Sequence, residues 1–152
     1  MRRFVIAGAV LCGLLLARGA MAIAPGWSIQ QTPNPTGGSN SALDGVSCVL
    51  ARACTAVGSS SRGTLAERWN GTKWTIERTP STGRDHFLQR VSCVSASSCI
   101  AVGSYLSRIT AAGAMLVERW DGAKWSVEPT PTPSGRSVLT GVSCVSASAC
   151  TA

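Results

Sequence analysis

Apolar and polar residues alternate with a period of two along much of the chain that follows residue 25. The alternation is clear in three short segments, 27–29, 74–76 and 125–127, in which a tryptophan and an aliphatic residue flank a polar one. This period is typical of β-strands, whose successive side chains point to opposite faces of the sheet. No later stretch shows the period of about 3.6 residues that an amphipathic helix requires. The pattern therefore predicts an all-β fold.

The predicted strands recur because the chain is built from repeats. One unit occurs three times, as GVSCVLARACTAVG (45–58), RVSCVSASSCIAVG (90–103) and GVSCVSASACTA (141–152). A second unit occurs twice, as LAERWNGTKWTIERTP (65–80) and LVERWDGAKWSVEPTP (116–131), and its end matches GWSIQQTPNP (26–35). The first cysteines of successive copies lie 45 and 51 residues apart, and the six additional residues fall between Cys99 and Trp120. A segment that accepts an insertion between fixed flanks is typical of a surface loop, which we expect at 104–115.

Each complete repeat predicts four short strands. V-S-C and C-x-A-V-G form a first hairpin, and the strand that ends in E-R-W forms a second one with the next strand. Asn70-Gly71 and Asp121-Gly122 are strong hairpin-turn signals, since both residue types can adopt positive φ. Four antiparallel strands in 45–51 residues match the size of a β-propeller blade. A parallel β-helix, with shorter coils and no tight hairpins, and a β-sandwich, which need not repeat in sequence, fit less well.

We therefore expect a β-propeller-like domain over 23–152. It would contain a closing strand at 26–35, blades at 43–80 and 88–131, and a partial blade at 139–152. About two and a half blades cannot close a ring, and their apolar edge strands would be exposed. We expect this chain to be the N-terminal part of a longer protein, with a short chain that closes the ring by oligomerising as the alternative.

The first 22 residues predict a signal peptide. Arg2 and Arg3 precede an apolar stretch at 4–17, and Ala20-Met21-Ala22 forms a small-x-small cleavage site. The apolar stretch has about fourteen residues, fewer than the roughly 20 of a membrane span. We expect export with cleavage after Ala22 and no stable membrane span in the mature chain, with an uncleaved N-terminal anchor as the alternative.

Cleavage also changes the charge. It removes three arginines, so Lys plus Arg falls from 14 to 11 against 7 acids and the net charge from +7 to +4. The remaining cations are scattered along the sequence, whereas a nucleic-acid-binding surface gathers them in a patch or stripe. No nucleic-acid partner is expected.

Cleavage removes Cys12 and leaves six cysteines, an even number that favours disulfides in an exported chain. Zinc sites usually pair cysteines two to four residues apart, and no Lys or His lies near enough in sequence to activate a redox thiol. Opposed residues of a hairpin lie within disulfide reach. The expected disulfides, with no metal and no cofactor, are Cys48–Cys54, Cys93–Cys99 and Cys144–Cys150.

The remaining recurrent residues predict structure rather than catalysis. Glutamates recur at 67 and 118 and at 77 and 128, whereas a glycosidase needs one specific carboxylate pair. The tryptophans recur at fixed positions, which favours packing between blades over carbohydrate stacking. No catalytic residue is predicted.

Two connections depart from the uniform repeat and would emerge on one side of a propeller, at 81–90 and 104–115. They predict a possible ligand-binding face that comprises Arg84, Asp85, His86, Tyr105 and Arg108.

The pattern V-S-C-x5-C-x-A-V-G followed by L-x-E-x-W-[DN]-G-x-x-W resembles that of a group of exported bacterial tandem-repeat proteins. The resemblance covers nearly all of 26–152 and implies a propeller-like fold without implying an activity. We expect an exported, non-catalytic binding or surface-interaction module for an extracellular glycan or protein. The alternatives are the N-terminal part of a propeller enzyme that acts on polysaccharide, and an oligomeric lectin-like propeller.

Overall fold

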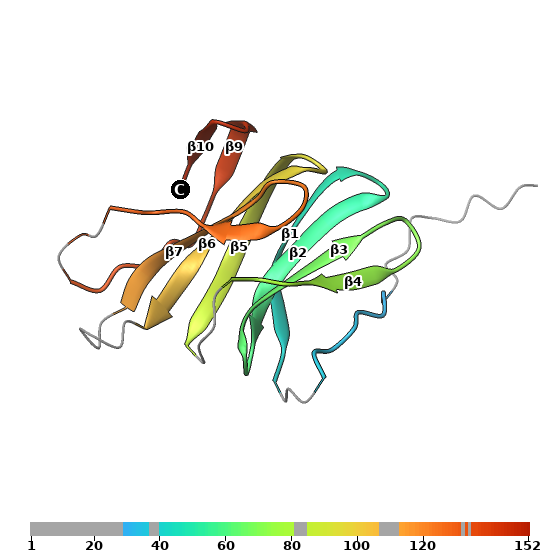
Figure 1. Ribbon diagram of the computed structural model, residues 1–152, viewed down its shortest axis with the longest axis horizontal. Helices are drawn as coiled ribbons and strands as arrows, with labels where there is room; N and C mark the ends of the chain where they lie inside the picture. The colour runs from blue at the N-terminus through green and yellow to red at the C-terminus, as the bar shows by residue number, and fades with distance from the viewer. Residues whose placement is uncertain (1–28, 37–39, 81–84, 107–112, 132, 134) are drawn as a thin grey trace, which may run out of the picture.

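The computed structural model describes residues 29–36, 40–80, 85–106, 113–131, 133 and 135–152. Its secondary structure consists of ten strands in three antiparallel sheets, and the described residues include no helix (Figure 1). The predicted all-β fold is confirmed. No helix long and apolar enough to cross a membrane occurs among these residues. The predicted signal peptide, 1–22, lies outside them.

The sheets follow the repeats. Unit 1 (40–80) contains β1 (Ala42–Leu50), β2 (Ala53–Ser60), β3 (Gly63–Trp69) and β4 (Trp74–Glu77), paired in that order. Unit 2 (85–131) contains β5 (His86–Ser95), β6 (Ser98–Leu106), β7 (Gly113–Trp120) and β8 (Trp125–Val127), also paired in order. Unit 3 (135–152) contains only β9 (Ser143–Ser146) and β10 (Ala149–Thr151).

The described strands do not form a closed ring, and the propeller-like arrangement therefore stays a prediction. The expected closing strand, 26–35, falls partly outside the described residues. Its described part, 29–35, pairs with no other described strand, and Ile29 is 93% exposed.

The first hairpin of units 1 and 2 requires the glycine of the recurring A-V-G segment. Leu43 pairs with Gly58 and Gly45 with Val57, so Asp44 forms a bulge, and the equivalent bulge occurs in β5. A Cβ on Gly58 would lie 1.9 Å from the carbonyl oxygen of Ala42, and one on Gly103 would lie 1.9 Å from that of Phe87. Only glycine allows the backbone of the bulged strand to approach this closely.

The second hairpin turns at the predicted position, but side-chain hydrogen bonds stabilise the turn in place of positive φ at both residues. Four residues connect Trp69 to its partner Trp74, and within this turn only Gly71 has a positive φ, of 98°. The Asn70 side-chain oxygen instead accepts the backbone N–H groups of Thr72 and Lys73, both at 3.0 Å. A side chain that binds the backbone two and three residues ahead stabilises the turn without requiring Asn70 itself to adopt positive φ.

Asp121 forms the equivalent turn in unit 2. Its Oδ1 accepts the backbone N–H groups of Ala123 and Lys124, both at 2.8 Å. The N–H of Lys124, and then that of Ala123, hold the pKa of Asp121 below its ordinary value, because both hydrogen bonds favour the charged carboxylate.

The hydrophobic core lies between unit 1 and unit 2, which pack face to face. Val57 and Ala66 of unit 1 meet Leu88, Ala101 and Leu116 of unit 2, and each of the five is buried. Trp120 and Trp125 belong to the same core, as expected for tryptophans that pack between units, whereas Trp69 and Trp74 are half-buried. Burial of such large aromatic surfaces is a major contribution to the stability of this arrangement.

Candidate functional site

Several residues that recur in the repeat contact the neighbouring unit. The hydroxyl oxygen of Ser47 accepts the backbone N–H of Cys93 at 3.0 Å, and that of Ser92 accepts the N–H of Cys144 at 3.1 Å. The same serine position therefore connects unit 1 to unit 2 and unit 2 to unit 3, which is a structural role.

The arginine of the E-R-W segment makes three further contacts between units. Arg68 donates to the carbonyl oxygen of Ala96 at 2.6 Å, and Arg119 donates to that of Ala147 at 2.9 Å. The Arg68 guanidinium also lies 4.7 Å from the ring centroid of Trp120, which is within the range of a cation–π interaction.

The recurrent glutamates of E-R-W are buried. Thr64 of unit 1 donates its hydroxyl to Glu118 of unit 2 at 3.0 Å, and Glu118 is 0% exposed. Glu67 is 1% exposed, and burial raises the pKa of its carboxyl, because desolvation disfavours the charged form. Neither carboxyl reaches solvent, so neither can contact a ligand from outside.

The three predicted disulfides are confirmed. Cys48–Cys54, Cys93–Cys99 and Cys144–Cys150 each join directly opposed positions of a hairpin, with Cα atoms 4.0 Å apart. Three intrachain disulfides are compatible with an extracytoplasmic protein.

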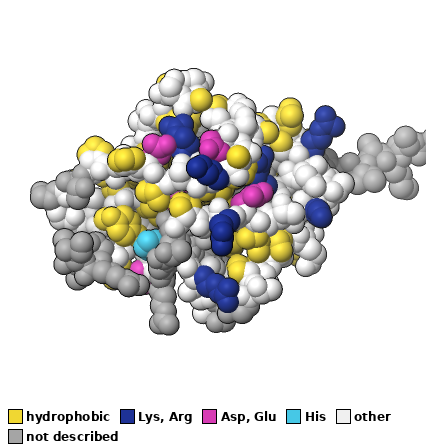
Figure 2. Space-filling view, viewed as in Figure 1, with side chains coloured by type: hydrophobic (Ala, Val, Ile, Leu, Met, Phe, Trp, Pro, Cys, Tyr) yellow, Lys and Arg dark blue, Asp and Glu magenta, His cyan; other side chains and the backbone are white. Residues whose placement is uncertain are grey.

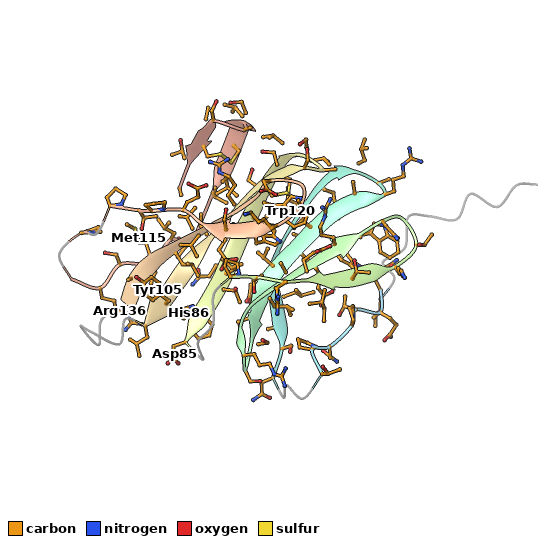
Figure 3. All side chains as sticks on the ribbon, in the orientation of Figure 1. Asp85, His86, Tyr105, Met115, Trp120 and Arg136 are labelled. Atoms are coloured by element: carbon orange, nitrogen blue, oxygen red, sulfur yellow. A yellow bond between two sulfur atoms is a disulfide. The ribbon has the colours of Figure 1, made fainter. Side chains whose placement is uncertain are left out.

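A cleft of about 200 Å³ lies at one end of the unit 2 sheet, where strands β5, β6 and β7 meet the start of unit 3. Figure 3 shows Asp85, His86, Tyr105 and Arg136 at this end, with Trp120 farther along the sheet between the units. The residues that line the cleft are Asp85, Phe87, Ser104, Tyr105, Leu106, Gly113, Arg136 and Val138. We call this the end cleft.

Backbone hydrogen bonds hold the three walls of the end cleft together. The N–H of Leu106 binds the carbonyl of Asp85 at 3.0 Å and so extends the pairing of β5 with β6. The N–H of Ser137 binds the carbonyl of Gly113 at 3.0 Å, which attaches the segment that carries Arg136 to the start of β7. The described residues Asp85, Leu106 and Gly113 thus lie at one end of the sheet, together with the start of unit 3.

The side chains of the end cleft combine aromatic surface with opposite charges. Phe87 supplies the exposed aromatic surface, at 41% exposure. His86 and Tyr105 oppose each other across β5 and β6, with ring centroids 5.2 Å apart, and strand alternation places both on the other face of the sheet, where Tyr105 packs against the core. The side chains of Asp85 and Arg136 are exposed, and neither forms a hydrogen bond or an ion pair with any described residue. Both charges therefore remain available to a ligand.

Unit 1 does not repeat these features. Asn40, Ala42 and Ser60 occupy the positions of Asp85, Phe87 and Tyr105, each 45 residues earlier. Ser60 is 7% exposed, and its hydroxyl binds the carbonyl of Gly63 within its own tight turn. The acidic and aromatic residues at this end of the sheet are therefore specific to unit 2 and are not required by the repeat.

The structure brings together three of the five residues of the predicted ligand-binding face, namely Asp85, His86 and Tyr105. Arg84 and Arg108 lie outside the described residues. Sequence reasoning missed Arg136, which follows Asp85 by 51 residues, the same spacing that separates Cys93 from Cys144. The register of the repeat could have placed it beside the predicted face.

Other kinds of site find no support in the described residues. No group of three or more His, Cys, Asp or Glu side chains there is arranged to hold a metal ion. On the face shown in Figure 2, Asp and Glu side chains lie among the Lys and Arg side chains, so the positive charge is interrupted. Comparison of the chain with protein-family models, curated proteins and solved structures finds no match.

Proposed function

We propose that this protein is an exported, non-catalytic binding module that holds one small polar group of an extracellular ligand in the end cleft. A single sugar ring of a glycan is the group that fits best. The repeat units form the scaffold, and the residues in which unit 2 differs from unit 1 form the site.

The observation that carries the proposal is the pair of opposite charges, Asp85 and Arg136, that bind no described residue and lie beside the exposed ring of Phe87. The Asp85 carboxylate can accept hydrogen bonds from two hydroxyl groups, and the Arg136 guanidinium can donate to ring or hydroxyl oxygens. Phe87, which is 41% exposed, offers flat apolar surface to the carbon face of a sugar. Convergent polar groups in a partly apolar concavity are typical of small-molecule sites.

The size of the end cleft supports a small group. Its volume of about 200 Å³ is below the roughly 300–1,000 Å³ of sites that take drug-sized ligands. One ring of a longer glycan can occupy it while the rest of the glycan remains in solvent. The size of the cleft therefore fits a protein that recognises a glycan by one exposed sugar ring.

The carboxylates support a non-catalytic role. Hydrolysis of a glycoside uses two carboxylates, roughly 5–10 Å apart, on either side of the bond. Asp85 is the only carboxylate among the described residues that line the end cleft, and the recurrent Glu67 and Glu118 are buried. The described residues of the cleft thus supply one carboxylate, and not the second carboxylate that glycoside hydrolysis needs.

The recurrent contacts support a propeller-like scaffold as part of the proposal. Unit 1 contacts unit 2 through the same serine and arginine positions by which unit 2 contacts unit 3. Repetition of one packing step places successive sheets around a common axis, as in the blades of a propeller.

Binding of the oxidised mature chain to an immobilised glycan array tests the proposal. We expect selective binding to glycans with an accessible terminal sugar, and loss of that binding in Asp85→Asn and Arg136→Gln. Arg52→Gln is the matched control, because Arg52 is an exposed arginine in the β1–β2 turn of unit 1. Equal binding by all variants, or no glycan binding at all, would overturn the proposal.

A further inference from the structure

The two charged residues of the end cleft occupy one position of the repeat. Asp85 follows Asn40 by 45 residues and precedes Arg136 by 51, the same spacings that separate the first cysteines of successive units. This position therefore carries an amide in unit 1, a carboxylate in unit 2 and a guanidinium in unit 3. Because units 2 and 3 are neighbours, the two opposite charges line the same cleft.

Arg136 differs from the arginines that stabilise the scaffold. Arg68, Arg90 and Arg119 each donate to a backbone carbonyl oxygen of another unit. The side chain of Arg136 is exposed and binds no described residue. An arginine can donate several hydrogen bonds from one planar group, and those of Arg136 remain for a ligand.

Gly113 determines where the side chain of Arg136 lies. A Cβ added to Gly113 would lie 3.0 Å from the Cγ of Arg136, 3.3 Å from its Nε and 3.6 Å from its Cδ. The side chain of Arg136 therefore lies directly over the backbone of Gly113, in space that a Cβ would occupy. The N–H of Ser137 binds the carbonyl of Gly113 at 3.0 Å and fixes the adjoining backbone. Such preorganisation lowers the cost of ordering a side chain when a ligand binds.

We propose that the end cleft selects a sugar ring that carries a carboxylate, a uronic acid unit of a glycan, and that Arg136, positioned by Gly113, binds this carboxylate. The inference rests on the proposed function and adds the class of sugar to it. A guanidinium presents paired N–H donors whose spacing matches the two oxygens of a carboxylate, and such charge-assisted pairs are stronger than neutral hydrogen bonds. A neutral sugar offers only hydroxyl and ring oxygens to the same group.

The other residues of the end cleft suit the rest of such a ring. Phe87 and Ser104 oppose each other across β5 and β6 and both line the cleft. The Ser104 hydroxyl forms no hydrogen bond with any described residue, so it can bind a sugar hydroxyl beside the exposed ring of Phe87. The Asp85 carboxylate accepts hydrogen bonds from hydroxyl groups and repels a second carboxylate. The carboxylate of the sugar is therefore directed to Arg136, which fixes the orientation of the ring.

Two matched pairs of sugars, glucuronate with glucose and galacturonate with galactose, are the probes. The members of each pair differ only in the group at the last carbon, which is a carboxylate in one and a hydroxymethyl group in the other. They would be titrated into the ¹⁵N-labelled oxidised chain of residues 23–152, and dissociation constants taken from the amide shifts. At least one uronate should bind about tenfold more tightly than its neutral partner. Added salt should narrow this ratio, because it screens exposed charges.

Variants separate the roles of the residues. Arg136→Gln should remove the preference for the uronate, whereas Asp85→Asn should weaken both members of a pair without lowering their ratio. Gly113→Ala should lower the ratio at least about threefold, because the new Cβ displaces the side chain of Arg136. It should leave the urea midpoint unchanged, since a flexible exposed side chain can move aside. Gly141→Ala is the matched control and should leave the ratio unchanged, because a Cβ there has no neighbour within 4 Å.

The outcomes distinguish this inference from the proposed function. Equal affinity for both members of each pair would overturn the inference and leave the proposed function intact. A preference for the uronate that survives Arg136→Gln, or that is the same in Gly113→Ala as in Gly141→Ala, would also overturn it. No binding of any of these sugars would contradict the inference and the proposed function together.

Discussion

The hydrogen bond from Thr64 to Glu118 offers a sharp test of the packing between units. Thr64→Val keeps the size and branching of the side chain and removes only the hydroxyl that donates to Glu118 at 3.0 Å. Thr64 is 7% exposed and Glu118 is 0% exposed, so water cannot readily replace the donor.

The expected loss follows from this burial. A hydrogen bond to a charged group contributes about 1.5–3 kcal/mol, and one between neutral groups about 0.5–1.5 kcal/mol. We expect Thr64→Val to lower the free energy of unfolding by about 2 kcal/mol. With a typical urea dependence, this corresponds to a fall of about 1 M in the urea midpoint.

Urea unfolding of the oxidised chain, followed by tryptophan fluorescence, is the assay. Thr75→Val is the matched control, because Thr75 is exposed and its hydroxyl bonds only within unit 1, to the carbonyl of Arg68 at 3.3 Å. We expect the control to change stability by less than about 0.5 kcal/mol. A double-mutant cycle with Glu118→Met, which removes the acceptor, should give a coupling energy of about 1 kcal/mol or more.

Equal effects of Thr64→Val and Thr75→Val would refute this reasoning, as would a coupling energy near zero. Either result would mean that the contact does not stabilise the packing of unit 1 against unit 2.

Three further predictions concern the scaffold. Burial raises the pKa of the Glu67 carboxyl above its ordinary value of 4.5. The stability that the protonated Glu67 contributes is therefore fully present below pH 4.5 and is lost as the pH rises through the raised pKa. Glu67→Gln should remove this pH-dependent loss of stability in urea titrations at a series of pH values. Backbone N–H groups hold the pKa of Asp121 below its ordinary value of 3.8. The stability that its carboxylate contributes is therefore present above pH 3.8 and is lost as the pH falls through the lowered pKa. Asp121→Asn, which places the residue type of Asn70 in this turn, should keep the turn and abolish this fall of the melting temperature at acid pH. Replacing Cys93 and Cys99 together by serine opens a loop of seven residues and should lower the free energy of unfolding by about 2 kcal/mol, whereas an unchanged urea midpoint would contradict this estimate.

The sequence predicted those parts of the fold that local chemistry determines. Cysteines six residues apart in a hairpin can oppose each other, so the pairing of Cys93 with Cys99 was accessible without the structure. The second hairpin was also placed correctly, but the sequence did not reveal that Asn70 stabilises it through side-chain bonds to backbone N–H groups. Asn and Asp favour a turn both by adopting positive φ and by accepting backbone N–H groups with the side chain. Only the backbone geometry shows which of these two mechanisms operates.

Contacts between units were beyond the reach of sequence reasoning. Whether Arg68 reaches the carbonyl of Ala96, or Ser47 the N–H of Cys93, depends on how two sheets are set against each other. The end cleft has the same origin, because Asp85 and Arg136 are 51 residues apart and meet only when unit 3 is docked on unit 2. Unequal loop lengths nevertheless pointed to the end of the sheet at which the end cleft lies.

Chemical-shift mapping gives the sharpest test of ligand binding in the end cleft. The ¹⁵N-labelled oxidised chain of residues 23–152 would be titrated with glucose, galactose, N-acetylglucosamine and glucuronate. At least one sugar should shift amide resonances at 85–87, 104–106 and 136–138, and Arg136→Gln should remove these shifts. Shifts centred on the repeated tryptophans Trp69 and Trp74, or no shifts with any of the four sugars, would contradict it.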